Sequence, residues 1–145
     1  MKKYIFISIF FFSVFNFSNV NSDTYYKYGT GDLQLSEGVV NAFIKYIRGE
    51  KGKSPNDFFV TTDGTSYYYW YCEYGQSNCQ EGHIREDTKI CEKFTGKTCK
   101  KFALRRQIKW KNGINPAKGR KSKINSKWSD TEIRDKLNEL GFYKN

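Results

Sequence analysis

Four cysteines and a single histidine are the residues of this 145-residue chain that could serve as nucleophiles or soft metal ligands. All five lie in YCEYGQSNCQEGHIREDTKICEKFTGKTC, residues 71–99. Six residues separate Cys72 from Cys79, and seven separate Cys91 from Cys99. Structural zinc sites typically use cysteine pairs two to four residues apart, so this spacing disfavours zinc. The redox motif Cys-x-x-Cys is also absent.

The even number of cysteines predicts disulfide bonds if the chain is exported. Four cysteines allow three pairings, and the spacing alone does not choose among them. We favour Cys72–Cys79 and Cys91–Cys99, because each short loop contains glycine or other turn residues. Oxidised cysteines would leave His83 without a thiol partner for nucleophilic catalysis. We therefore expect no catalytic residue, no metal site and no cofactor.

The first 22 residues, MKKYIFISIFFFSVFNFSNVNS, have the layout of a secretory signal peptide. Two lysines precede an apolar run of about 13 residues, which is short for a membrane span of ~20 residues. An uncleaved N-terminal anchor is the alternative. With cleavage before Asp23, the remaining chain carries 23 basic and 15 acidic side chains, a net charge of +8. We expect a periplasmic or secreted protein whose mature chain has no transmembrane span.

Hydrophobic periodicity and turn residues predict an α+β fold. Val40, Phe43 and Ile47 share one helical face in residues 36–48, and Ser129 with Glu132 forms a capping box for residues 129–141. A third helix is expected at about 81–94. The sheet should be small and antiparallel, with strands near 58–62, 66–72 and 99–110, the last being either one strand or two that turn at Arg105-Arg106.

These elements suggest five segments along the chain. They are a signal peptide (1–22), an N-terminal helix with its linker (23–57), a disulfide-stapled α+β core (58–110), a basic loop (111–128) and a C-terminal helix with its tail (129–145).

The strongest functional feature is charge. Residues 96–129 contain twelve Lys or Arg and no Asp or Glu. Such a block creates a positive surface potential that recruits polyanions, although a solvated lysine-rich face is an equally good explanation. The candidate anion-binding residues are Lys101, Arg105, Arg106, Lys109, Lys111, Lys118, Arg120, Lys121 and Lys123.

The aromatic run YYYWY, residues 67–71, is the second candidate surface. Alternate residues of a strand face opposite ways, so Tyr67, Tyr69 and Tyr71 could form an exposed row suited to stacking on sugars or bases. Ordinary cross-strand packing is the favoured alternative, since aromatic residues are common in strands generally.

The core also resembles a group of small exported proteins of marine and other alphaproteobacteria, which have no characterised activity. The resemblance covers residues 58–110. The shared positions are Tyr71, Cys72, Cys79, Cys91, Gly96, Cys99, Phe102, Ala103, Arg106, Ile108 and Trp110. It implies export, disulfides and a small α+β core, and it transfers no catalytic residue.

Three functional hypotheses follow, in this order. The first is a non-enzymatic exported module whose basic surface contacts an anionic envelope polymer or lipid headgroups. The second is a structural or protein-interaction domain that docks an envelope protein through the amphipathic helices 36–48 and 129–141. The third is a small hydrolase. Nucleic acid is the least favoured polyanion, because the chain is expected outside the cytosol.

Overall fold

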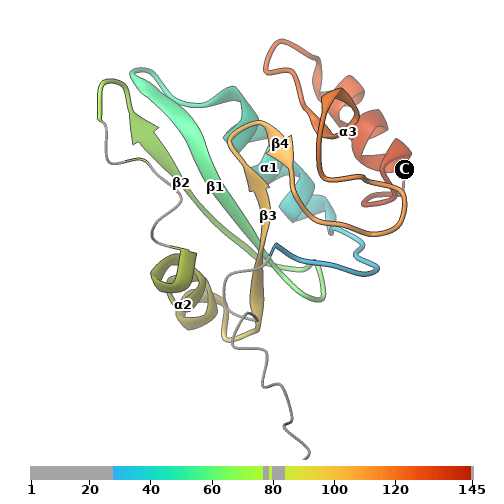
Figure 1. Ribbon diagram of the computed structural model, residues 1–145, viewed down its shortest axis with the longest axis horizontal. Coiled ribbons are helices and arrows are strands. Elements are labelled where there is room, and N and C mark those ends of the chain that lie inside the picture. Colours follow the sequence, from blue (N-terminus) through green and yellow to red (C-terminus); the bar gives the residue numbers. More distant parts are fainter. Residues whose placement is uncertain (1–27, 77–78, 80–83, 145) are drawn as a thin grey trace, which may run out of the picture.

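The computed structural model describes residues 28–76, 79 and 84–144 and has the predicted α+β fold (Figure 1). The proposed signal peptide and His83 lie outside these residues. In chain order the elements are α1 (Glu37–Arg48), β1 (Lys53–Thr61), β2 (Tyr67–Glu73), α2 (Ile84–Thr95), β3 (Cys99–Leu104), β4 (Gln107–Ile108), the 3-10 helix η3 (Arg120–Ser122) and α3 (Asp130–Glu139).

The four strands form one antiparallel sheet in the order β2-β1-β3-β4. Phe58 at the centre of β1 lies opposite Tyr69 of β2 and Ala103 of β3. The alternative of two short strands in 99–110 is confirmed, because the chain turns between β3 and β4 at Arg105, which has a positive φ of 52°.

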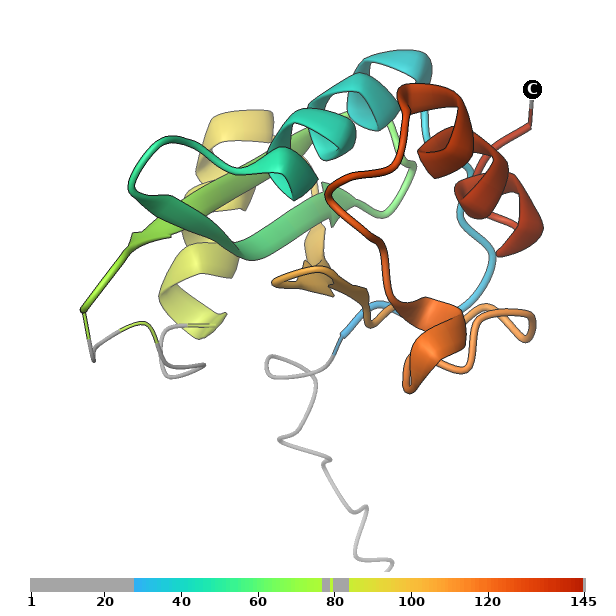
Figure 2. The same ribbon diagram turned by 90° about the horizontal axis from the view of Figure 1, so that it is seen from above.

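The helices cover both faces of the sheet (Figure 2). Phe58 and Val60 of β1 belong to the main core, which α1 and α3 close. Phe59, between them in sequence, faces the opposite way and packs with Cys91 of α2 and Cys99 of β3. Successive residues of β1 therefore enter two different apolar clusters, which is why 58–60 is apolar throughout.

The helix boundaries follow local capping chemistry. Ser36 caps α1 by accepting a hydrogen bond from the Val39 amide, and Gly49 ends it with a positive φ of 78°. The predicted capping box of α3 is present: the Ser129 hydroxyl accepts from the Glu132 amide, and the Glu132 carboxylate accepts from the Ser129 amide.

Residues 29–31, which precede α1, form hydrogen bonds with β3 and with the segment that follows β4. The Gly29 amide donates to Lys101 O, and the Trp110 indole donates to Gly31 O at 2.8 Å. Gly29 lies directly against the Trp110 ring, where a Cβ would overlap the indole carbons. This close approach requires glycine at position 29.

Two segments expected to be loop are more structured than the sequence indicates. β1 begins at Lys53, five residues before the predicted start, and Pro55 is accommodated because it adjoins a register shift in the pairing with β2. The basic loop 111–128 is irregular apart from η3, yet it buries Asn115, Ser122 and Ile124. Its contribution to the core depends on these few residues rather than on a periodic pattern.

Candidate anion-binding groove

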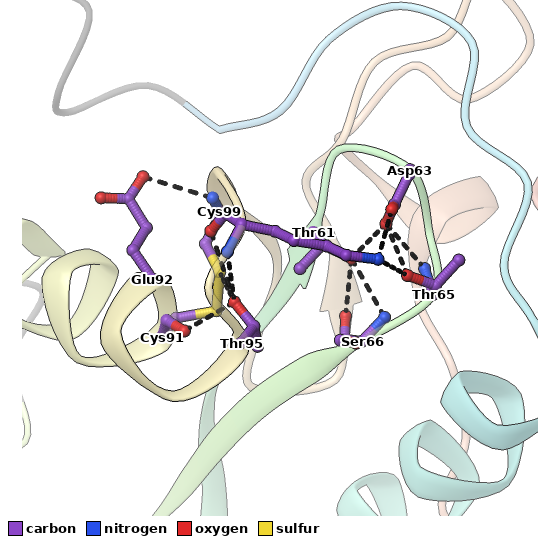
Figure 3. The surroundings of a disulfide bond; sticks show 9 residues. Thr61, Asp63, Thr65, Ser66, Cys91, Glu92, Thr95 and Cys99 are labelled. Atoms are coloured by element: carbon purple, nitrogen blue, oxygen red, sulfur yellow. Dashed lines mark hydrogen bonds and ion pairs between the residues drawn. A yellow bond between two sulfur atoms is a disulfide. The ribbon is translucent and has the colours of Figure 1, made fainter.

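Both predicted disulfides are present, Cys72–Cys79 with a Cα–Cα distance of 5.9 Å and Cys91–Cys99 with 6.1 Å. The second joins the C-terminal half of α2 to the start of β3, and the Thr95 hydroxyl donates to Cys91 O beside it (Figure 3). Because all four cysteines are paired, none is a free nucleophile. Such bonds are typical of proteins that leave the reducing cytosol.

The turn next to this disulfide is held by Asp63, whose carboxylate accepts from Thr61, Thr65 and Lys97 (Figure 3). The Lys97 ammonium, 2.7 Å away, and the two hydroxyls lower the pKa of Asp63. Lys97 is therefore paired within the fold and belongs to a different surface from the other basic residues described below.

Two of the three tyrosines of the candidate row are not exposed, and ordinary packing, the favoured alternative, describes them. Tyr69 and Tyr71 are half-buried and pack on the ring of Tyr46 from α1, at centroid distances of 5.6 and 6.2 Å. Of the three, only Tyr67 is exposed, at 42%, and its ring stacks on Phe58. Since helices cover both faces of the sheet, the period of two in the sequence does not reveal which face is exposed.

Lys101 does not lie on the predicted basic surface. Its side chain is 1% exposed, and its ammonium lies 2.6 Å from the Asp57 carboxylate, which is 2% exposed. The rings of Tyr28 and Phe59 lie 5.8 and 5.7 Å from the same ammonium. A buried lysine requires such a partner, and this one lies 44 positions earlier in the chain. Lys101 is a core residue, not an anion ligand.

The other predicted anion ligands fall into two groups on either side of the turn that precedes η3. Arg105, Arg106, Arg120 and Lys123 line one concavity. Lys109, Lys111 and Lys118 line another, next to Tyr28. Lys121 is exposed and lines neither.

The first concavity is built on the β3–β4 turn, which α1 holds in place. The buried Tyr46 hydroxyl donates to Arg105 O at 2.7 Å, and burial raises the pKa of Tyr46 well above its ordinary value. The Arg106 Nε donates to Ile47 O, in the last turn of α1, at 2.9 Å. The turn therefore presents two consecutive arginines from a fixed backbone.

The segment around η3 brings the other two cations to the same place. The Ile124 amide donates to Arg106 O at 2.8 Å, and Gln107 forms an isolated β-bridge with Lys123. The Gln107 amide group donates to Gly119 O at 3.4 Å. These contacts position Arg120 and Lys123 opposite the arginines of the β3–β4 turn.

We refer to the resulting concavity as the arginine groove. It consists of two adjoining hollows of about 600 and 400 Å³ that share Arg106, Arg120 and Lys123. The full lining is Leu104, Arg105, Arg106, Gln107, Gly119, Arg120, Lys123, Ile124, Asn125, Ser126 and Trp128.

The groove is strongly positive because it contains four cations and no acidic side chain. Arg105, Arg120 and Lys123 are exposed, and Arg106 is half-buried. None of the ion pairs found within residues 28–76, 79 and 84–144 involves any of the four. Guanidinium groups bind carboxylate, sulfate or phosphate oxygens in bidentate fashion, so the groove is suited to an oxyanion-bearing ligand.

The acid-free block of the sequence predicted the groove's cations but not its remaining lining. Gln107 directly follows Arg106 in the sequence, whereas Trp128 joins the groove with residues 119–126, which are distant from the β3–β4 turn in the sequence. Trp128 lies within the acid-free block and just before the predicted C-terminal helix, but neither position predicts that it lines the groove.

Among residues 28–76, 79 and 84–144, no group of histidine, cysteine or acidic side chains is arranged to hold a metal ion. None of the helices described is long and apolar enough to cross a membrane. Comparison with protein families, with curated proteins and with solved structures finds no match to this chain.

Proposed function

We propose that this protein is a non-enzymatic, exported binding module whose arginine groove binds an anionic polymer of the cell envelope. The observation that carries the proposal is the convergence of four cations in one concavity with no acidic side chain in its lining. Export, to the periplasm or the exterior, is supported by the signal-like N-terminal sequence and by the two disulfides.

The arginines of the β3–β4 turn are held in place by α1, which favours a binding site over a basic surface that is only solvated. Arg106 is held through its Nε, and the carbonyl of Arg105 is held by Tyr46. Flexible surface lysines lose side-chain entropy when they bind, whereas arginines held on a rigid turn lose less. The groove is therefore partly organised before a ligand arrives.

The alternative of a protein-docking domain depends on exposed apolar stripes on the flanking helices. In α1 the stripe residues Val40, Phe43 and Ile47 are buried in the core. In α3 Ile133 and Leu137 are buried as well. These stripes are not available to a partner, so the apolar faces of α1 and α3 give this alternative no support.

The test uses heparin, a sulfated glycan, as a probe, with binding measured at a series of salt concentrations. The groove variant is Arg120→Gln with Lys123→Gln. The control, Lys89→Gln with Lys93→Gln, removes the same charge from exposed positions on α2, far from η3 in both ribbon views (Figures 1 and 2). Arg106 is left unchanged because its hydrogen bond to α1 supports the fold.

We expect the groove variant to bind roughly 10–30-fold more weakly, since a cation near an anionic surface contributes about 1 kcal/mol. The slope of log affinity against log salt should fall by about one to two, because two counterion-releasing contacts are lost. The control should stay close to wild type. Equal losses in both variants would mean that net charge alone drives binding, and would contradict the proposal.

A further inference from the structure

A second basic concavity adjoins the arginine groove. We call it the lysine pocket: about 430 Å³, lined by Lys109, Lys111 and Lys118 together with Tyr28, Pro116 and neighbouring backbone. No acidic side chain lines it. Lys111 and Lys118 are exposed, and the Lys109 ammonium lies 5.7 Å from the Tyr28 ring centroid.

One short turn separates the two sites. Lys118 lines the lysine pocket, while Gly119 and Arg120 line the arginine groove. Two residues of chain span at most about 7 Å, so the two linings meet at this turn.

The turn is held by a buried polar cluster centred on Asn115, which is 3% exposed. Its side-chain amide donates to Trp110 O at 2.7 Å, and its oxygen accepts from the Ser122 hydroxyl at 2.6 Å. The same oxygen accepts from the amide of Ala117, which has a positive φ of 59°. The turn therefore fixes the two sites relative to each other.

We infer that a single linear polyanion occupies both sites and crosses the Lys118–Arg120 turn, so that the ligand is a long anionic chain and not a compact anion. The inference rests on the proposed function and specifies its ligand. A chain that engages one site presents its next charges to the other at high effective concentration, which strengthens binding without any new contact type.

The aromatic groups of the two sites favour an anionic glycan over single-stranded nucleic acid. Base-stacking proteins offer free aromatic faces to successive bases. Here Tyr28 already has the ammonium groups of Lys101 and Lys109 over its ring, at 5.8 and 5.7 Å. Trp128 is half-buried and packs against the core. Charge recognition, rather than base stacking, is what these surfaces provide.

The experiment compares a heparin tetrasaccharide with a heparin octadecasaccharide. Four proteins are measured: wild type, the groove variant Arg120→Gln with Lys123→Gln, a pocket variant Lys111→Gln with Lys118→Gln, and the α2 control Lys89→Gln with Lys93→Gln. A long fragment gains a statistical advantage in every protein, so the quantity compared is the ratio of long-fragment to short-fragment affinity.

In wild type and in the α2 control we expect this ratio to be about tenfold or more, below the ~10²–10⁴ of ideal linkage. The pocket variant should reduce the ratio at least threefold while it leaves tetrasaccharide binding in the arginine groove nearly intact. An unchanged ratio in the pocket variant would overturn the two-site inference and leave the proposed function standing. No binding of either fragment by wild type would overturn both, and tighter binding of a charge-matched single-stranded oligonucleotide would overturn the glycan assignment.

Discussion

Replacing Lys101 by methionine should destabilise the fold by about 3–5 kcal/mol, because it leaves the Asp57 carboxylate buried without its cation. Both side chains are at most 2% exposed, and their charged atoms lie 2.6 Å apart. In the variant, the Asn56 amide group, 3.3 Å from the other carboxylate oxygen, cannot replace a full positive charge.

The magnitude follows from the opposing terms. With an effective dielectric constant of about 20, two unit charges at 2.6 Å attract by roughly 6 kcal/mol. Burying each ion costs several kcal/mol, so the intact pair is close to neutral overall. Removing one partner abolishes the attraction and leaves most of the other ion's burial cost. Replacing both should restore stability, so Asp57→Leu combined with Lys101→Met is expected within about 2 kcal/mol of wild type.

Stability is measured by urea unfolding and by a thermal melt, both followed by tryptophan fluorescence with the disulfides intact. In the thermal melt the single variant should lower Tm by roughly 10–20 °C. Lys93→Met, at an exposed position on α2, is the matched control and should change the free energy of unfolding by less than about 0.5 kcal/mol. A loss below about 1 kcal/mol for Lys101→Met, or a double variant no more stable than the single one, would refute the reasoning.

Three further predictions concern the fold. Gly29→Ala should destabilise the fold by about 1–3 kcal/mol, because the added methyl group would overlap the Trp110 indole. The control, Gly38→Ala in the open first turn of α1, should be neutral or slightly stabilising in the same thermal melt. Replacing Cys91 and Cys99 together by alanine should cost about 2.5 kcal/mol in chemical unfolding, since a short closed loop is released; a cost near zero would contradict this. The pKa of Asp63 is lowered in the folded state, so its contribution to stability is present above its ordinary pKa of 3.8 and is lost as pH falls below that value. The difference in unfolding free energy between wild type and Asp63→Asn should therefore shrink in acid. A difference that stays constant with pH would contradict this prediction.

Much of the fold could be predicted because its determinants are local. The caps at Ser36 and Ser129 bond to residues three positions away. The two disulfides join cysteines that are seven and eight positions apart in the sequence. Asp63 likewise bonds within its own turn. Features of this kind can be recognised in a few consecutive letters of sequence.

The features that were missed depend on non-local contacts. Lys101 resembles any other lysine of the basic block until Asp57 is known to lie beside it. Tyr69 and Tyr71 are covered by α1, whose placement on that face no periodicity specifies. Composition therefore identifies the basic segment but overestimates how much of it faces solvent.

The same distinction applies to the candidate site. The acid-free block predicted which residues are basic, and seven of the nine candidates line one of two adjoining concavities. Their division into an arginine groove and a lysine pocket results from backbone bonds such as Ile124 N to Arg106 O, which join segments far apart in sequence. The positions of basic residues in the sequence do not predict such bonds.

The most direct test of the central claim is an NMR titration of backbone amides with a long heparin fragment. If the arginine groove binds the glycan, the largest shift changes should occur in residues 104–107 and 119–128. The lysine pocket residues 109–118 should also be affected, and α2 should be essentially unchanged. Shift changes centred on α2, or spread evenly over the exposed lysines of the molecule, would contradict it.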